Sequence, residues 1–73
     1  MVRYLTVLRE IRESKGYTII EVSKGSKIPA STLYDVESGR KGLIFSRAKS
    51  IADFFEEPIE KLFFATYFRA KLK

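Results

Sequence analysis

Apolar residues recur at helical spacing in successive segments of the chain, a pattern that predicts an all-α protein. Near the N-terminus, Tyr4, Leu8 and Ile11 stand at positions i, i+4 and i+7, with mostly charged residues on the other side. A first helix is therefore expected from about Arg3 to Lys15. No alternating run of apolar and polar residues is long enough to predict a strand.

Two short helices joined by a tight turn are predicted next. Thr18 and Glu21 have the spacing of a capping box, in which each side chain accepts a hydrogen bond from the other residue's amide, so a helix is expected from Ile19 to about Lys24. Pro29 is tolerated only in the first turn of a helix and predicts a third helix over residues 30–37. Two helices joined in this way are typical of a helix-turn-helix.

The second half of the chain predicts two further helices. A fourth is expected before Pro58 from apolar residues at helical spacing, namely Ile44, Ala48, Ile51, Ala52 and Phe55. A fifth is expected to extend from Ile59 to the C-terminus, over residues 59–73. We therefore expect five helices in a single domain of residues 1–73.

The predicted fifth helix is apolar on two faces, which indicates two partners. One face packs on the core through Phe63, whereas Phe64, Phe68 and Leu72 follow at i, i+4 and i+8 on another. We interpret this second face as a homodimer contact. Two alternatives stay open: residues 1–4 cover these rings within one monomer, or the helix lies on a membrane surface, which the acidic residues at its start disfavour.

Length and charge narrow the function. The 73 residues carry 14 Lys and Arg against 9 Asp and Glu, a net charge of +5, and residues 1–49 hold 10 basic and 5 acidic side chains, so the whole excess lies there. The absence of His and Cys disfavours an enzyme and leaves no expected metal or cofactor. No stretch reaches the ~20 apolar residues of a membrane span. A small cytoplasmic domain with a polyanionic partner is expected.

Several motifs resemble the phage-repressor/Cro family of helix-turn-helix regulators, also described as XRE-type or lambda-repressor-like. The resemblance covers Leu8 to Phe63 without a gap. It rests on Arg12-Glu-Ser-Lys-Gly-Tyr-Thr18 at the entry to the second helix and on Ser31-Thr-Leu-Tyr-Asp-Val-Glu-Ser-Gly39 at the exit of the third. It implies a five-helix DNA-binding domain, with the helix-turn-helix formed by the second and third helices.

The resemblance also implies roles for individual residues. Positions of the third helix that face base edges in the family are Ala30, Ser31, Thr32, Tyr34 and Asp35. Candidate phosphate contacts are Thr18, Arg40 and Lys41, to which we add Lys27 beside the turn. Arg12 and Glu37 match a pair that ties the first helix to the end of the third.

The chain departs from the family at four positions. Ile19 replaces a phosphate-binding Gln and is expected to pack inside; Lys27 and Glu56 replace turn glycines; Leu43 replaces a Pro. A left-handed backbone at Lys27 costs roughly 1 kcal/mol or more, which the neighbouring Gly25 could relieve by reshaping the turn.

The third helix holds no Arg, Gln or Asn for bidentate contacts to a base. We therefore expect modest direct readout and a larger share of affinity from phosphates and DNA shape. Asp35 either accepts a hydrogen bond from a cytosine, or only solvates the helix face or pairs with a lysine. Lys27 either contacts phosphate or only attracts DNA at long range.

The predicted function is that of a dimeric, non-enzymatic, repressor-like regulator that binds double-stranded DNA at the nucleoid. The alternative is a protein-interaction module of the same fold, resembling an antitoxin or antirepressor, with weak DNA binding. No sensor domain is expected in the remaining length, so control is expected through the concentration of the protein, a regulatory protein partner or competition for the operator.

Overall fold

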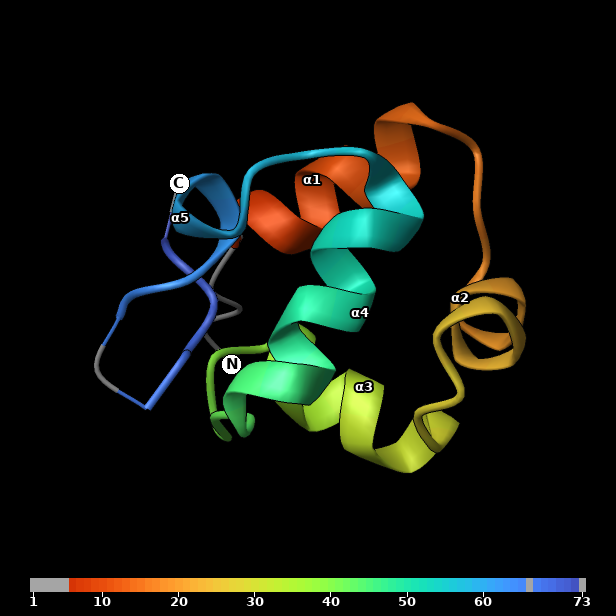
Figure 1. Ribbon diagram of the computed structural model, residues 1–73. Helices are drawn as coiled ribbons and strands as arrows, with labels where there is room; N and C mark the ends of the chain where they lie inside the picture. Colours follow the sequence, from red (N-terminus) through yellow and green to blue (C-terminus); the bar gives the residue numbers. More distant parts are fainter. Residues whose placement is uncertain (1–5, 66, 73) are drawn as a thin grey trace, which may run out of the picture.

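Five helices build the protein in the computed structural model, which describes residues 6–65 and 67–72 (Figure 1). They are α1 (Val7–Ser14), α2 (Ile19–Ser26), α3 (Ala30–Glu37), α4 (Phe45–Phe55) and α5 (Ile59–Leu62). The described part of the chain contains no strand, only two isolated antiparallel bridges. The expected all-α fold with five helices is confirmed, and no described helix has the length and apolar character needed to cross a membrane.

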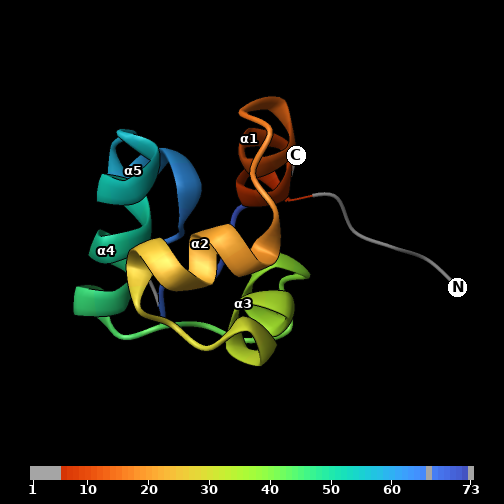
Figure 2. The same cartoon turned by 90° about the vertical axis from the view of Figure 1, so that its right-hand side faces the viewer.

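Helix α4 runs through the middle of the molecule, and α2 and α5 pack against it. Figure 1 shows α3 below it and α2 to its side, while Figure 2 shows α2 lying across the front with α3 beneath it. Helix α2 packs against both α3 and α4, and α5 packs against α4 and α1. Burying apolar surface between these helices drives folding, and the buried core comprises Leu8, Ile11, Ile19, Val22, Ile28, Leu33, Val36, Leu43, Ala48, Ile51, Ala52, Phe55, Leu62, Phe63 and Ala70.

Helix α1 begins at Val7 rather than at Arg3, so its predicted start was wrong. Thr6 is the N-cap residue, with extended backbone angles, and its hydroxyl accepts a hydrogen bond from the amide of Arg9 (3.2 Å). The same hydroxyl donates to the carbonyl of Glu37 (2.6 Å). Tyr4, which the predicted apolar stripe included, lies outside the described residues.

Helix α2 continues two residues beyond its predicted end, through Gly25. A Cβ atom at Gly25 would overlap the ring of Phe54, so this glycine lets α4 approach α2 closely. Because Gly25 is helical, it does not reshape the turn, and Lys27 takes the left-handed conformation directly, with φ +60°. Glu56, at the end of α4, does the same with φ +56°.

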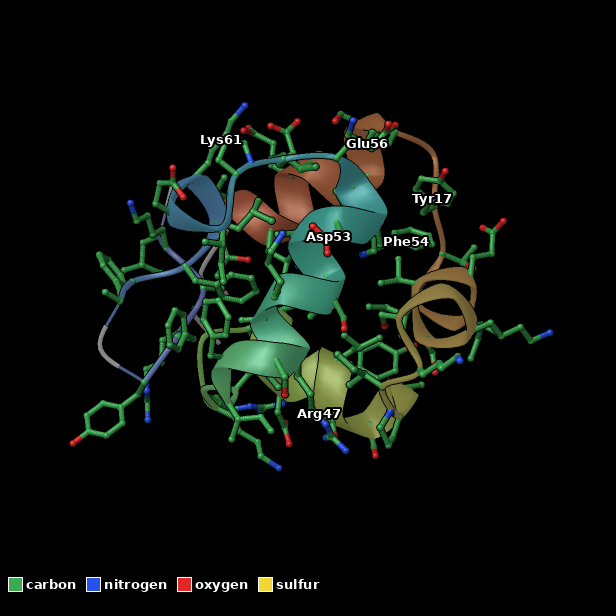
Figure 3. The ribbon with its side chains drawn as sticks, in the orientation of Figure 1. Tyr17, Arg47, Asp53, Phe54, Glu56 and Lys61 are labelled. Carbon is green, nitrogen blue, oxygen red and sulfur yellow. The ribbon has the colours of Figure 1, made fainter. Side chains whose placement is uncertain are left out.

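Helix α4 begins at Phe45, one residue later than its apolar pattern indicated. Ile44 is the N-cap residue and is 67% exposed, so it does not belong to the buried stripe. At the other end, the ring of Phe54 lies 5.0 Å from that of Tyr17, between centroids, and ties the entry of α2 to α4 (Figure 3).

The C-terminal helix over residues 59–73 is the main wrong prediction, because α5 ends at Leu62. Phe63 has an extended backbone (φ −130°, ψ 147°), and the chain then reverses through Tyr67 and Phe68, which both have positive φ. We call residues 63–65 and 67–72 the C-terminal arm. In the predicted helix, aromatic side chains would point to all sides. The arm instead buries Phe63 and Ala70 and leaves Phe64 exposed. Antiparallel bridges join Phe63 to Ala70 and Thr6 to Leu72.

Candidate nucleic-acid interface

Helix α3 presents a polar outer face. Pro29 is its N-cap residue, and the helix spans Ala30–Glu37 as predicted. Leu33 and Val36 bury the inner face in the core. On the outer face, Ser31 is exposed and Tyr34 is 58% exposed.

The other three candidate base contacts are half-buried. Ala30 packs partly against the core, and Thr32 and Asp35 are each partly covered. The face available to a ligand therefore consists mainly of Ser31, Tyr34 and the outer side of Asp35, which are small, aromatic and acidic groups.

Asp35 and Arg40 form an ion pair between α3 and the loop that follows it. The Arg40 guanidinium donates to Asp35 Oδ1 through Nη2 (2.9 Å), and the amide of Arg40 donates to the Asp35 carbonyl (3.0 Å). Both side chains keep much of their surface in solvent, 71% for Arg40 and 46% for Asp35. We call residues 39–42 the basic loop; Lys41 within it is exposed.

Thr18 and Glu21 form the predicted capping box at the start of α2. The amide of Thr18 donates to Glu21 Oε1 (2.9 Å), and the amide of Glu21 donates to the Thr18 hydroxyl (3.1 Å). The hydrogen bond from the Thr18 amide, and then one from its side chain, lower the pKa of Glu21 below its usual value. A phosphate at Thr18 must therefore approach a carboxylate that stays charged. Ile19, the next residue, is buried, as expected.

Arg12 and Glu37 link α1 to the end of α3. Arg12 donates to both carboxylate oxygens of Glu37, at 2.7 Å from Nε and 2.9 Å from Nη2, and its Nη1 donates to the Tyr17 carbonyl at 2.8 Å. The hydrogen bond to Glu37 raises the pKa of Arg12, against the effect of its partial burial. Since Glu37 is only 8% exposed, this bidentate pair fixes the direction of α3 relative to α1.

One cation near α3, Arg47, was not predicted from the sequence. Figure 3 places Arg47, in the first turns of α4, at the end of α4 that lies beside α3, and it is exposed. The sequence feature that could have identified Arg47 is its position, a basic residue soon after the basic loop. Lys27, at the opposite end of α3 from Arg40, is exposed as well. Exposed cations therefore stand at both ends of the recognition helix.

The residues expected to form a dimer contact do not share a helical face, because the arm is not helical. Phe64 and Leu72 are 50% and 55% exposed and border a shallow hollow of about 250 Å³, which Gly39 and Ala70 also line. Phe68 is half-buried, and its ring packs edge-on against Phe45 with 5.5 Å between centroids.

The exposed side chains of this surface define which ligand groups it can contact. Among the described residues, no three His, Cys, Asp or Glu side chains gather in a group that could hold a metal ion. What the surface offers is a helix with hydroxyl, phenol and carboxylate groups, flanked by guanidinium and ammonium groups. The hydroxyl, phenol, guanidinium and ammonium groups can donate to phosphates and base edges, whereas the carboxylate only accepts hydrogen bonds.

The geometry defines the class of domain first: α2 and α3, joined by the turn at Lys27–Pro29, form a helix-turn-helix within a five-helix fold. A helix-turn-helix family model matches residues 8–62, three quarters of the chain. The chain belongs to this XRE-type, Cro/CI-like family of DNA-binding transcription regulators. No curated protein and no solved structure gives a significant match.

Proposed function

We propose that the protein is a repressor-like transcriptional regulator that binds an operator as a homodimer, with α3 in the major groove. The observation that carries this proposal is the exposed outer face of α3, flanked by Lys27 at one end and by Arg40 and Lys41 at the other. A recognition helix with cations at both ends matches the two phosphate backbones that border a groove. Operator binding places the protein at the nucleoid, in the cytoplasm.

Each exposed group of α3 has a defined capacity for readout. Ser31 and Thr32 can donate to or accept from several base edges, and Ala30 can contact a thymine methyl group. Tyr34 can bond a phosphate or stack on a sugar, while Asp35 can accept only from a cytosine amino group. Because these groups discriminate weakly, we assign much of the affinity to phosphate contacts by Arg40 and Lys41, with Lys27 and Thr18 contributing less.

A homodimer through the arm is supported by the exposed apolar side chains of Phe64 and Leu72. Two copies joined about a twofold axis present two α3 helices, which suit half-sites about 34 Å apart. Phe68 contributes indirectly, by holding the arm against Phe45.

Binding is tested with the purified protein and duplex DNA from the region that flanks its own coding sequence. Fluorescence anisotropy at about 50 and 200 mM salt should show a steep loss of affinity. Arg40→Gln and Lys41→Gln should each reduce the salt slope by about 1. The matched control is Lys61→Gln, which removes a cation on the far side of the molecule from α3 (Figure 3). Absence of binding at low salt contradicts the proposal.

Dimerisation is tested separately, without DNA. Phe64→Glu and Leu72→Glu should each give a monomer by sedimentation, since a charge on this face cannot be desolvated. Ile20→Glu alters a comparably exposed apolar residue on α2 (53% exposed) and should leave the dimer intact. If both arm variants stay dimeric, the arm is not the interface.

One observation favours a second candidate function. Helix α3 contains no basic residue, so its own charge does not attract DNA. A protein-interaction module of the antitoxin or antirepressor kind would use the same exposed face to hold a protein partner. This alternative predicts weak DNA binding that the Tyr34→Ala variant does not weaken further.

A further inference from the structure

The C-terminal arm lies outside the region that matches the family, yet it packs back onto the start of α1 and onto the segment that joins α3 to α4. The family match ends at residue 62, just before the arm begins. Lys71 donates its amide to the Leu62 carbonyl (2.9 Å), and its own carbonyl accepts from the Val7 amide (2.8 Å). These hydrogen bonds anchor the C-terminal end of the arm to the end of α5 and the start of α1.

Three contacts connect the middle of the arm to the basic loop and the residues that follow it. The Leu43 amide donates to the Tyr67 carbonyl (3.1 Å), and Arg69 Nη1 donates to the Gly39 carbonyl (3.2 Å). The third is the edge-on packing of Phe68 against Phe45. The arm therefore holds the chain on both sides of Arg40 and Lys41.

Gly42 is the point of closest approach between loop and arm. A Cβ atom at this position would overlap the backbone carbonyl of Tyr67. A backbone atom cannot swing aside as a flexible side chain does, so any residue but glycine would force the loop and the arm apart.

Beside these contacts the loop and the arm leave an open hollow of about 450 Å³, lined by Gly42, Leu43, Ile44, Tyr67 and Arg69. The position of the basic loop thus depends on a few directed contacts.

The arm reaches these contacts through a strained turn. Tyr67 and Phe68 have φ values of +58° and +44°, in the left-handed region that residues with a side chain avoid. Such a conformation persists only where the surrounding contacts compensate for it. Tyr67 and Phe68 contact Leu43 and Phe45, and Phe68 also packs against the core.

We propose that the arm is a brace that holds the basic loop in the position in which it binds phosphate, and that Arg69 is a positioning residue rather than a phosphate ligand. The inference rests on the proposed function for its effect on DNA. A loop ordered before binding loses less conformational entropy in the complex, so the brace increases affinity without contacting DNA.

The first test measures how firmly the basic loop is held against the arm in the absence of DNA. Hydrogen exchange of the Leu43 amide should be faster in Arg69→Met and in Gly42→Ala than in the wild type, while Lys61→Met leaves it unchanged. This readout does not depend on DNA binding, so it separates failure of the brace from failure of the proposed function. If the Leu43 amide exchanges at the wild-type rate in both Arg69→Met and Gly42→Ala, the proposal that the arm holds the loop is overturned.

The second test measures affinity for a short fluorescein-labelled duplex of mixed sequence. Arg69→Met should weaken binding about fivefold, the loss of one hydrogen bond that positions the loop. In an Arg40→Gln/Lys41→Gln background, Arg69→Met should lower the affinity for the duplex almost no further, because the loop then carries no cation to position. The uncharged change Gly42→Ala should show the same dependence on background, and an unfolding curve confirms that it folds.

An independent phosphate contact by Arg69 gives a different result. Arg69→Met then weakens binding equally in both backgrounds and lowers the salt slope by about 1, and Gly42→Ala has no parallel effect. That outcome overturns the role of Arg69 as a positioning residue. Lys61→Met, which removes the same charge without touching the loop, should stay within about twofold of the wild type.

Discussion

Asp35 on the recognition helix neutralises Arg40 in the basic loop, with 2.9 Å between Oδ1 and Nη2. Both residues are candidate DNA contacts, so in the free protein each occupies the group that the other would offer to DNA. We therefore expect a cytosine amino group that replaces Arg40 at the carboxylate to release the guanidinium to a phosphate. In that case the ion pair would couple the one acidic base contact to a phosphate contact.

Replacing Asp35 should uncouple these two contacts. Asp35→Asn removes a negative charge from the face of α3 and frees Arg40, so affinity for duplex DNA of mixed sequence should rise about fivefold at low salt. Discrimination between cytosine and other bases at the contacted position should fall. Anisotropy titrations with a set of single-base variants of the bound site measure both effects.

The matched control for this prediction is Asp53→Asn. Asp53 is an exposed carboxylate on α4 that is likewise paired with a cation, Lys49 Nζ, at 2.6 Å. If Asp53→Asn raises affinity as much as Asp35→Asn, the effect is one of net charge and the coupling is refuted.

Local signals predicted the helix-turn-helix well, because its boundaries are encoded in neighbouring residues. Pro29 starts α3 and the capping box of Thr18 and Glu21 starts α2, so both starts were predictable. The positive φ of Lys27 and Glu56 could be expected only from comparison with turn glycines of the family.

The arm could not be predicted, because distant contacts decide its conformation. Phe63 and Phe64 fit a helix as well as an extended segment, and the choice depends on the pairing of Phe63 with Ala70 and of Phe64 with Arg69 across the turn. No local pattern carries that information. Interface residues such as Arg47 were missed for a related reason, since only the fold brings the start of α4 beside α3.

The Arg12–Glu37 pair should be important for stability because it is largely removed from water. The side chains are 14% and 10% exposed, so removal of one leaves the other charge poorly solvated. Arg12→Met should lower the free energy of unfolding by about 3 kcal/mol, measured by urea denaturation. The double variant Arg12→Met/Glu37→Gln should recover part of this loss. Simple additivity of the two single changes would argue against a coupled pair.

The capping box should make stability depend on pH in the acidic range. The pKa of Glu21 is lowered in the folded state, so the unfolded chain binds its proton at a higher pH than the native protein does. The stabilisation is present above the pKa of the unfolded state and is lost as the pH falls through the folded pKa. The stability difference between wild type and Glu21→Gln should thus shrink from about pH 5 downward. Unfolding curves at several pH values measure it, and a constant difference contradicts it.

Lys27 combines a backbone strain with a candidate phosphate contact, and one substitution should separate the two. Lys27→Gly removes the cost of a side chain at φ +60° and should stabilise the fold by up to about 1 kcal/mol. It also removes a cation at the end of α3, so the salt slope of DNA binding should fall by about 1. Glu56→Gly relieves a similar strain at φ +56° away from α3, and should stabilise the fold without lowering DNA affinity. Thermal unfolding and anisotropy titration of both variants test this separation. If Lys27→Gly keeps the full salt slope, Lys27 attracts DNA only at long range and is not a phosphate ligand.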